Sequence, residues 1–124
     1  MTTKPDVTLP EGDPSGKALA QTDLIVGDGD EAVAGKNVEM HYVGVSWNTG
    51  QQFDASWDRN DTFGFRLGSG QVIPGWEQGV PGMKVGGRRQ LVIPPALAYG
   101  SAGAGGVIGP NEHLVFVIDL ISVS

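Results

Sequence analysis

The chain has 124 residues, enough for one domain with a single hydrophobic core. It contains no cysteine, which excludes disulfides, thiolate metal ligands and thiol nucleophiles, and its formal net charge of -6 disfavours binding to nucleic acid. Glycine accounts for 20 residues and hydrophobic side chains for 40% of the chain, a composition typical of a β-rich domain with many tight turns.

Residues 1–20 are rich in proline, glycine and mixed charges, so we expect a flexible N-terminal arm followed by one folded domain at 21–124. Within the arm, Val7 and Leu9 are available to pack as one short strand. The arm lacks the apolar core of a secretory signal, and no apolar stretch approaches the roughly 18 residues of a membrane span. We therefore expect a protein that binds no membrane. The absence of cysteine fits a reducing cytoplasm, which is the compartment we expect, and we also expect a monomer.

The folded part is predicted to begin with a strand at 23–26. In the next strand apolar and polar side chains alternate, so that Val38, Met40 and Tyr42 share one face. A third strand, at 63–67, follows the same pattern, with Phe63, Phe65 and Leu67 on one face.

The segment 74–80 is the one helix candidate. Pro74 suits the first turn of a helix, and Gly79 ends it after about two turns. Two more strands follow, at 88–93 and 114–121, and the second is apolar on most of both faces, as is typical of a central strand. These elements predict an α+β fold, with an antiparallel sheet of about five strands and one short helix packed across it.

The usual catalytic constellations are absent from the sequence. The two histidines, His41 and His113, have no ligand-like spacing, so we expect neither a metal nor a cofactor. There is no nucleophile elbow, phosphate-binding loop or dinucleotide-binding motif. The aromatic residues lie on strands or beside turns, which fits either a core or a pocket, and the glycine-rich loop 101–110 carries an apolar pair, Val107-Ile108, that a solvated loop has no need of.

A series of short motifs follows in order along residues 23–123. They are His41-Tyr42-Val43-Gly44, Phe53-Asp54-Ala55-Ser56, Phe63-Gly64-Phe65-Arg66-Leu67-Gly68, Val72-Ile73-Pro74-Gly75-Trp76, Gly86-Gly87-Arg88-Arg89, Ile93-Pro94-Pro95, Ala98-Tyr99-Gly100 and Leu114-Val115-Phe116. In this order they resemble an FKBP-type peptidyl-prolyl cis-trans isomerase. The resemblance implies a curved antiparallel sheet wrapped around the short helix, with the active pocket between them.

The resemblance also implies a set of site residues around a proline ring, with Trp76 as the floor of the pocket. The backbone N–H of Ile73 and the hydroxyl of Tyr99 are expected to donate to substrate carbonyls, and the Asp54 carboxylate to face the rotating carbonyl. The implied substrate-binding residues are Tyr42, Phe53, Arg59, Phe63, Val72, Ile108 and Phe116.

The implied partners are peptides and folding or unfolded proteins that contain X-Pro bonds. Macrolides whose pipecolyl ring resembles proline are the implied inhibitors. The glycine-rich loop departs from the better-known members of the family: Ala104 stands where they often carry histidine, Val107-Ile108 where they have two isoleucines, and Gly109-Pro110 where they have two prolines.

Catalysis of this rotation needs no nucleophile, because the barrier of about 18–20 kcal/mol comes from amide resonance. An apolar pocket that takes the amide out of water favours the twisted, less polar form. Two other hypotheses stay open: a proline- or macrolide-binding module with incidental turnover, and a sugar-binding domain that uses Trp47 and Trp57. For Asp54, a structural pairing with Arg59 or Tyr42 is an alternative to a catalytic role, and the two roles can coexist.

Overall fold

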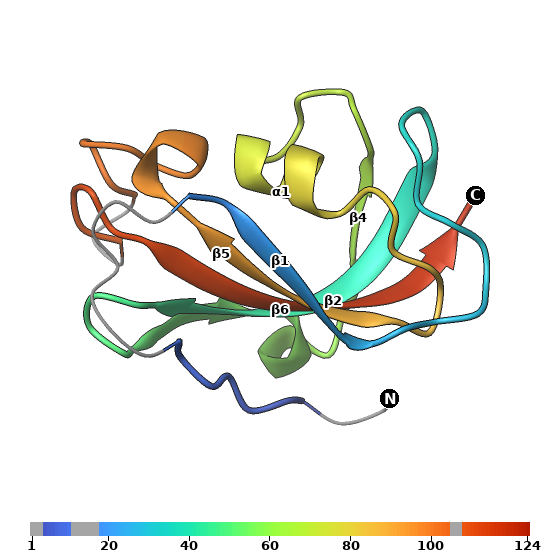
Figure 1. Ribbon diagram of the computed structural model, residues 1–124, viewed down its shortest axis with the longest axis horizontal. Coiled ribbons are helices and arrows are strands. Elements are labelled where there is room, and N and C mark those ends of the chain that lie inside the picture. Colours follow the sequence, from blue (N-terminus) through green and yellow to red (C-terminus); the bar gives the residue numbers. More distant parts are fainter. Residues whose placement is uncertain (1–3, 11–17, 105–107) are drawn as a thin grey trace.

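The computed structural model describes residues 4–10, 18–104 and 108–124. Over these ranges the chain forms an α+β fold with six strands and one short α-helix (Figure 1). The strands are β1 (Ala20–Ile25), β2 (Asn37–Ser46), β3 (Gln52–Ala55), β4 (Phe63–Arg66), β5 (Arg88–Ile93) and β6 (Leu114–Val123). The helices are α1 (Pro74–Gly79) and two 3₁₀ turns, η1 (Ser56–Arg59) and η2 (Pro95–Leu97). In the described part of the chain, no helix is both long and apolar enough to cross a membrane.

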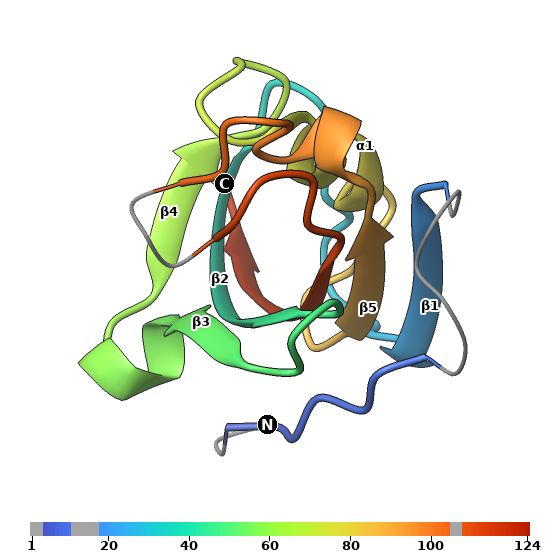
Figure 2. The same cartoon turned by 90° about the vertical axis from the view of Figure 1, so that its left-hand side faces the viewer.

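The strands form one antiparallel sheet in the order β1-β5-β6-β2-β3, and β4 also pairs with β2. The sheet curves around one side of α1 (Figure 2), which confirms the predicted fold class and the single short helix. The last strand, β6, lies at the centre of the order, as its apolar character on both faces predicts.

The sheet has one strand more than the sequence analysis predicts, because β3 was not recognised. Its four residues, Gln-Phe-Asp-Ala, include one large apolar side chain, so alternation gives no indication of a strand. The segment is extended because β2 offers it an edge to pair with, from Val43 to Val45. A long-range pairing, rather than local propensity, makes this strand.

The core lies between α1 and the concave face of the sheet. The alternating residues predicted to share a face, such as Met40 on β2 and Leu120 on β6, are fully buried there. Helix α1 approaches β5 closely because two of its residues are glycines. A Cβ on Gly75 would overlap Ile93, and one on Gly79 would lie 2.7 Å from Leu91 Cδ2. These two glycines therefore set the distance between helix and sheet.

The opposite face of the sheet carries the N-terminal segment 4–10, which runs along the side away from α1 (Figure 1). Val7 and Leu9 pack against an apolar cluster of β2 and β3 side chains, although the segment pairs with no strand. Lys4 Nζ lies 2.9 Å from Asp58 Oδ1 on η1. The division into an arm at 1–20 and a domain at 21–124 stays a prediction, and residues 11–17 lie outside the described ranges.

Replacing both Val7 and Leu9 by serine is expected to lower the free energy of unfolding by about 1–3 kcal/mol, since both side chains are half-buried on the sheet. Urea denaturation of the full chain measures this loss. Thr8→Ala, at the exposed position between them, is the matched control and should change stability little. Equal stability of the double variant and the control would show that the packing of this segment contributes nothing.

Candidate active site

A cavity of about 470 Å³ opens between α1 and the concave face of the sheet. Its lining comes from the strands β2, β3, β4 and β6 and from α1. The loop before α1 and the loop after η2 complete it. The lining residues are Tyr42, Phe53, Asp54, Phe63, Gln71, Val72, Ile73, Trp76, Ala98, Tyr99 and Phe116. All the predicted site residues except Arg59 and Ile108 are in this lining. Gln71 and Ala98 were not predicted, and each is the chain neighbour of a predicted residue.

Trp76 is the aromatic centre of the cavity. It lies in the first turn of α1, is only 6% exposed, and its ring centroid is 5.0 Å from that of Tyr42 and 5.2 Å from that of Phe116. Phe63 approaches it at 5.8 Å. These contacts are edge-to-face, the arrangement that aromatic rings favour. Among the described residues the buried Trp76 indole N–H has no hydrogen-bond partner, so it is a free donor on an otherwise apolar ring.

Gly44 shapes the adjoining wall, a role that the sequence analysis did not assign. The rings of Phe53 and Phe116 meet over this position at 5.5 Å and 88°. A Cβ on Gly44 would lie 2.6 Å from Phe53 Cζ and 2.8 Å from Phe116 Cε1. A glycine inside a strand often marks such a close approach. The position of Gly44 within the predicted strand was therefore the one sequence feature that could have indicated this role.

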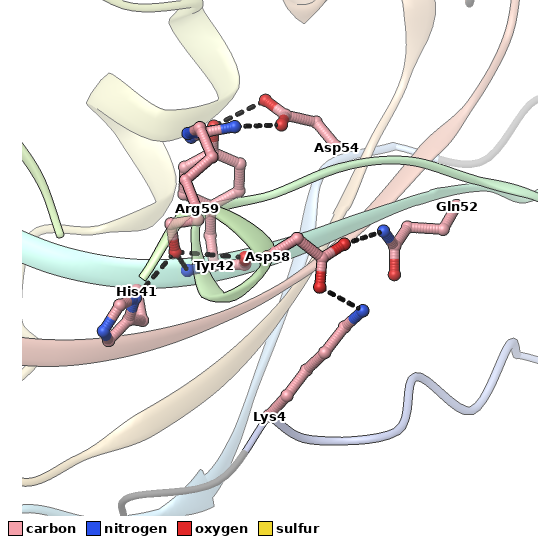
Figure 3. Close-up of polar contacts among 8 residues, drawn as sticks. Lys4, His41, Tyr42, Gln52, Asp54, Asp58 and Arg59 are labelled. Carbon is pink, nitrogen blue, oxygen red and sulfur yellow. Dashed lines mark hydrogen bonds and ion pairs between the residues drawn. The ribbon is translucent and has the colours of Figure 1, made fainter. Parts of the chain in front are cut away.

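The polar end of the cavity is a three-residue network on β2, β3 and η1 (Figure 3). The Tyr42 hydroxyl donates to Asp54 Oδ2 at 2.5 Å. The Arg59 guanidinium donates to Asp54 Oδ1 at 2.5 Å and to the Tyr42 hydroxyl at 2.8 Å. Arg59 thus lies outside the cavity lining but holds Asp54 and Tyr42, which are in it. This is the structural pairing of Asp54 that the sequence left as an alternative to a catalytic role.

This network fixes the charge of its members at neutral pH. Burial raises the pKa of the Tyr42 hydroxyl, and its hydrogen bond to Asp54 raises it further, against the opposing effect of Arg59. For Asp54, burial alone would raise the pKa, but the hydrogen bonds from Tyr42 and Arg59 outweigh it and hold the pKa below its ordinary value. The cavity therefore faces an ionised carboxylate and a neutral phenol.

Both donors predicted at the cavity wall, the backbone N–H of Ile73 and the hydroxyl of Tyr99, are without partners in the part of the chain that the structure describes. The Ile73 carbonyl accepts from Trp76 N at 3.0 Å, which fixes this residue at the start of α1. Tyr99 is 38% exposed, and burial, together with the negative charge of Asp54, raises its pKa. Tyr99 therefore keeps its proton and remains a donor.

Ile108 lies apart from the cavity lining. It is buried in the core cluster and forms a two-way backbone bridge with Ala104, at 2.9 and 3.0 Å. This bridge closes the loop back on itself. Val107, the other member of the predicted apolar pair, falls outside the described residues.

The comparisons with known proteins agree with this geometry. The family model of FKBP-type peptidyl-prolyl cis-trans isomerases matches residues 29–121. The chain is 57% identical to an FK506-binding protein of Streptomyces anulatus, over 97% of each chain. It is 54% identical to a probable FK506-binding protein of Corynebacterium glutamicum, over 96% of this chain and 98% of that one. The crystal structure of AtFKBP13 superposes with a TM-score of 0.79 at 44% identity, covering 86% of this chain and 93% of that one.

The chain belongs to the FKBP-type peptidyl-prolyl cis-trans isomerase family. Members of this family are enzymes that isomerise X-Pro peptide bonds, and the predicted fold, family and enzyme class are confirmed. The sugar-binding hypothesis finds no support, since its two tryptophans are half-buried against histidines. Trp57 stacks on His41 at 4.0 Å, and Trp47 meets His113 edge-on at 6.4 Å.

Replacing Arg59 by glutamine is expected to raise the pKa of Asp54, because the guanidinium hydrogen bonds and charge that lower it are removed. A ¹³C NMR titration of the aspartate carboxyls measures the change. Arg66→Gln, at an exposed site outside the network, is the matched control. An unchanged Asp54 pKa in Arg59→Gln would contradict the network as described.

Proposed function

We propose that the enzyme isomerises X-Pro bonds by removing the amide from water in the cavity around Trp76, without a covalent step. The observation that carries this proposal is an aromatic cavity of about 470 Å³ with one charged end. Its described lining includes no serine, cysteine, histidine or lysine. The volume suits a proline ring with parts of the flanking residues.

The chemistry of the amide explains why such a cavity is enough. The planar amide is charge-separated and well solvated, while the twisted amide is less polar and its nitrogen becomes pyramidal. Apolar walls therefore destabilise the planar form relative to the twisted one. In this proposal the proline ring lies on Trp76, and Tyr42, Phe63 and Phe116 form the walls.

The polar groups orient the substrate. We assign the Ile73 N–H and the Tyr99 hydroxyl as donors to substrate carbonyls, which is supported by their having no other partner in the described structure. The Asp54 carboxylate faces the rotating carbonyl, where its negative charge disfavours the planar form with its partly negative oxygen. One hydrogen bond contributes about 0.5–1.5 kcal/mol, or up to roughly tenfold in rate, so no single donor accounts for catalysis.

The remaining residues support this arrangement. Phe53 and Val72 line the cavity where the proline ring is proposed to bind. Arg59 holds Asp54 in place, and Ile108 anchors the glycine-rich loop in the core. The proposed substrates are X-Pro bonds in peptides and in folding or unfolded proteins. We further propose a monomeric, cytoplasmic enzyme, since a chain without cysteine is compatible with a reducing compartment.

Exchange NMR on a short X-Pro peptide tests the catalytic proposal. The protein should accelerate cis-trans exchange, and Trp76→Leu should lower kcat/KM roughly 10- to 100-fold, since it removes the apolar floor. Trp47→Leu, which changes a half-buried tryptophan outside the cavity lining, is the control and should retain the activity. Exchange at the background rate, or activity unaffected by Trp76→Leu, would contradict the proposal.

FK506 is proposed as a competitive inhibitor that occupies the same cavity, as the names of the two curated relatives suggest. Calorimetric titration should give one site per chain, saturating FK506 should abolish the acceleration, and Trp76→Leu should weaken the binding. Tight binding without acceleration by the free protein would instead favour the alternative of a binding module. FK506 binding that leaves exchange untouched would place the macrolide elsewhere.

A further inference from the structure

Strand β2 has a gap in its hydrogen bonding next to the cavity. On one edge β2 pairs first with β4, up to Met40 opposite Phe63, and then with β3, from Val43 opposite Ala55. Between these two ladders the edge of β2 at Tyr42 has no strand beside it. The Tyr42 backbone groups on this edge are buried and need another partner.

Ser56 fills this gap with its side chain. It is the first residue of η1 and is fully buried. Its Oγ accepts from the Tyr42 backbone N–H at 2.7 Å and lies 3.3 Å from the Tyr42 carbonyl oxygen. It also lies 2.9 Å from His41 Nδ1. One hydroxyl thus serves as the strand partner that neither β3 nor β4 supplies.

The same short turn holds the other end of Tyr42. Three residues after Ser56, Arg59 donates to the Tyr42 hydroxyl and to Asp54 (Figure 3). Tyr42 is therefore bound by η1 at its backbone and at its phenol. The turn is itself held against β2, because Trp57 stacks on His41 with the ring planes 18° apart.

We propose that Ser56 is a positioning residue of the active site, whose hydroxyl sets the Tyr42 backbone so that the Tyr42 phenol meets Asp54 and Arg59. Ser56 is absent from the cavity lining and acts only through Tyr42. The expected effect of Ser56 on catalysis rests on the proposed function. The expected effect of Ser56 on the position of the Tyr42 phenol is independent of it.

A double-mutant cycle of Ser56→Ala and Tyr42→Phe separates positioning from a general loss of stability. Alone, Ser56→Ala is expected to lower kcat/KM roughly 2- to 10-fold, the worth of one hydrogen bond. In the Tyr42→Phe background it should cost less than about twofold, because the phenol that it positions is already gone. Losses that multiply in the double variant would overturn the proposal.

A second measurement does not depend on activity. In Ser56→Ala the Asp54 pKa should rise, since the Tyr42 hydroxyl no longer holds its hydrogen bond to the carboxylate. The ¹³C titration of Asp54 measures this shift even if the wild-type protein shows no isomerase activity. An unmoved Asp54 pKa in a folded Ser56→Ala protein would overturn the positioning role and leave the proposed function intact.

Two further variants complete the design. Val38→Ala removes buried apolar volume from the same strand without touching a hydrogen bond, so it destabilises the fold but should leave kcat/KM and the Asp54 pKa unchanged. Ser56→Cys is close to serine in volume and weakens the hydrogen bond to the Tyr42 backbone. It replaces Ser56→Ala in the double-mutant cycle if the alanine variant does not fold. Wild-type values for both readouts in a folded Ser56→Cys protein would contradict the proposal.

Discussion

The close approach of α1 to β5 is the constraint on which the rest of the structure depends. Gly75 and Gly79 allow it, because a side chain at either position would meet a β5 side chain. Trp76 lies between these glycines and is carried against the concave face of the sheet, where the aromatic rings of β2, β4 and β6 meet it. A helix held farther out would leave these rings as separate surface groups. The cavity is thus a consequence of helix–sheet distance.

The polar end of the cavity shows how an apolar site keeps a charge. The Asp54 carboxylate is only partly exposed, which by itself disfavours its charge, but it accepts from Tyr42 and Arg59, and both bonds favour its ionised form. The two side chains that hold it come from β2 and η1. The turn η1 therefore links the covered outer face of the sheet, where Lys4 meets Asp58, to the inner face where the cavity opens.

Much of the fold could be predicted from the sequence, and the errors have a common cause. The alternation in β2 and β6 and the helix start at Pro74 are local patterns, and the structure confirms them. The strand β3 and the contacts of Gly44 and Ser56 were missed. Each depends on a partner brought close by register: β3 on the edge of β2, Gly44 on two rings, and Ser56 on an unpaired backbone.

By itself the sequence determined the family, the order of most elements and the set of aromatic residues, since ordered motifs and alternation are written in the chain. Composition and alternation left open whether those aromatics form a core or a pocket, and the resemblance implied a pocket. Only the tertiary structure shows the cavity that they line. Ser56 meets the Tyr42 backbone across 14 positions, and Arg59 meets its phenol across 17. Contacts at such separations depend on strand register and on the distance between helix and sheet, and no local pattern encodes either one.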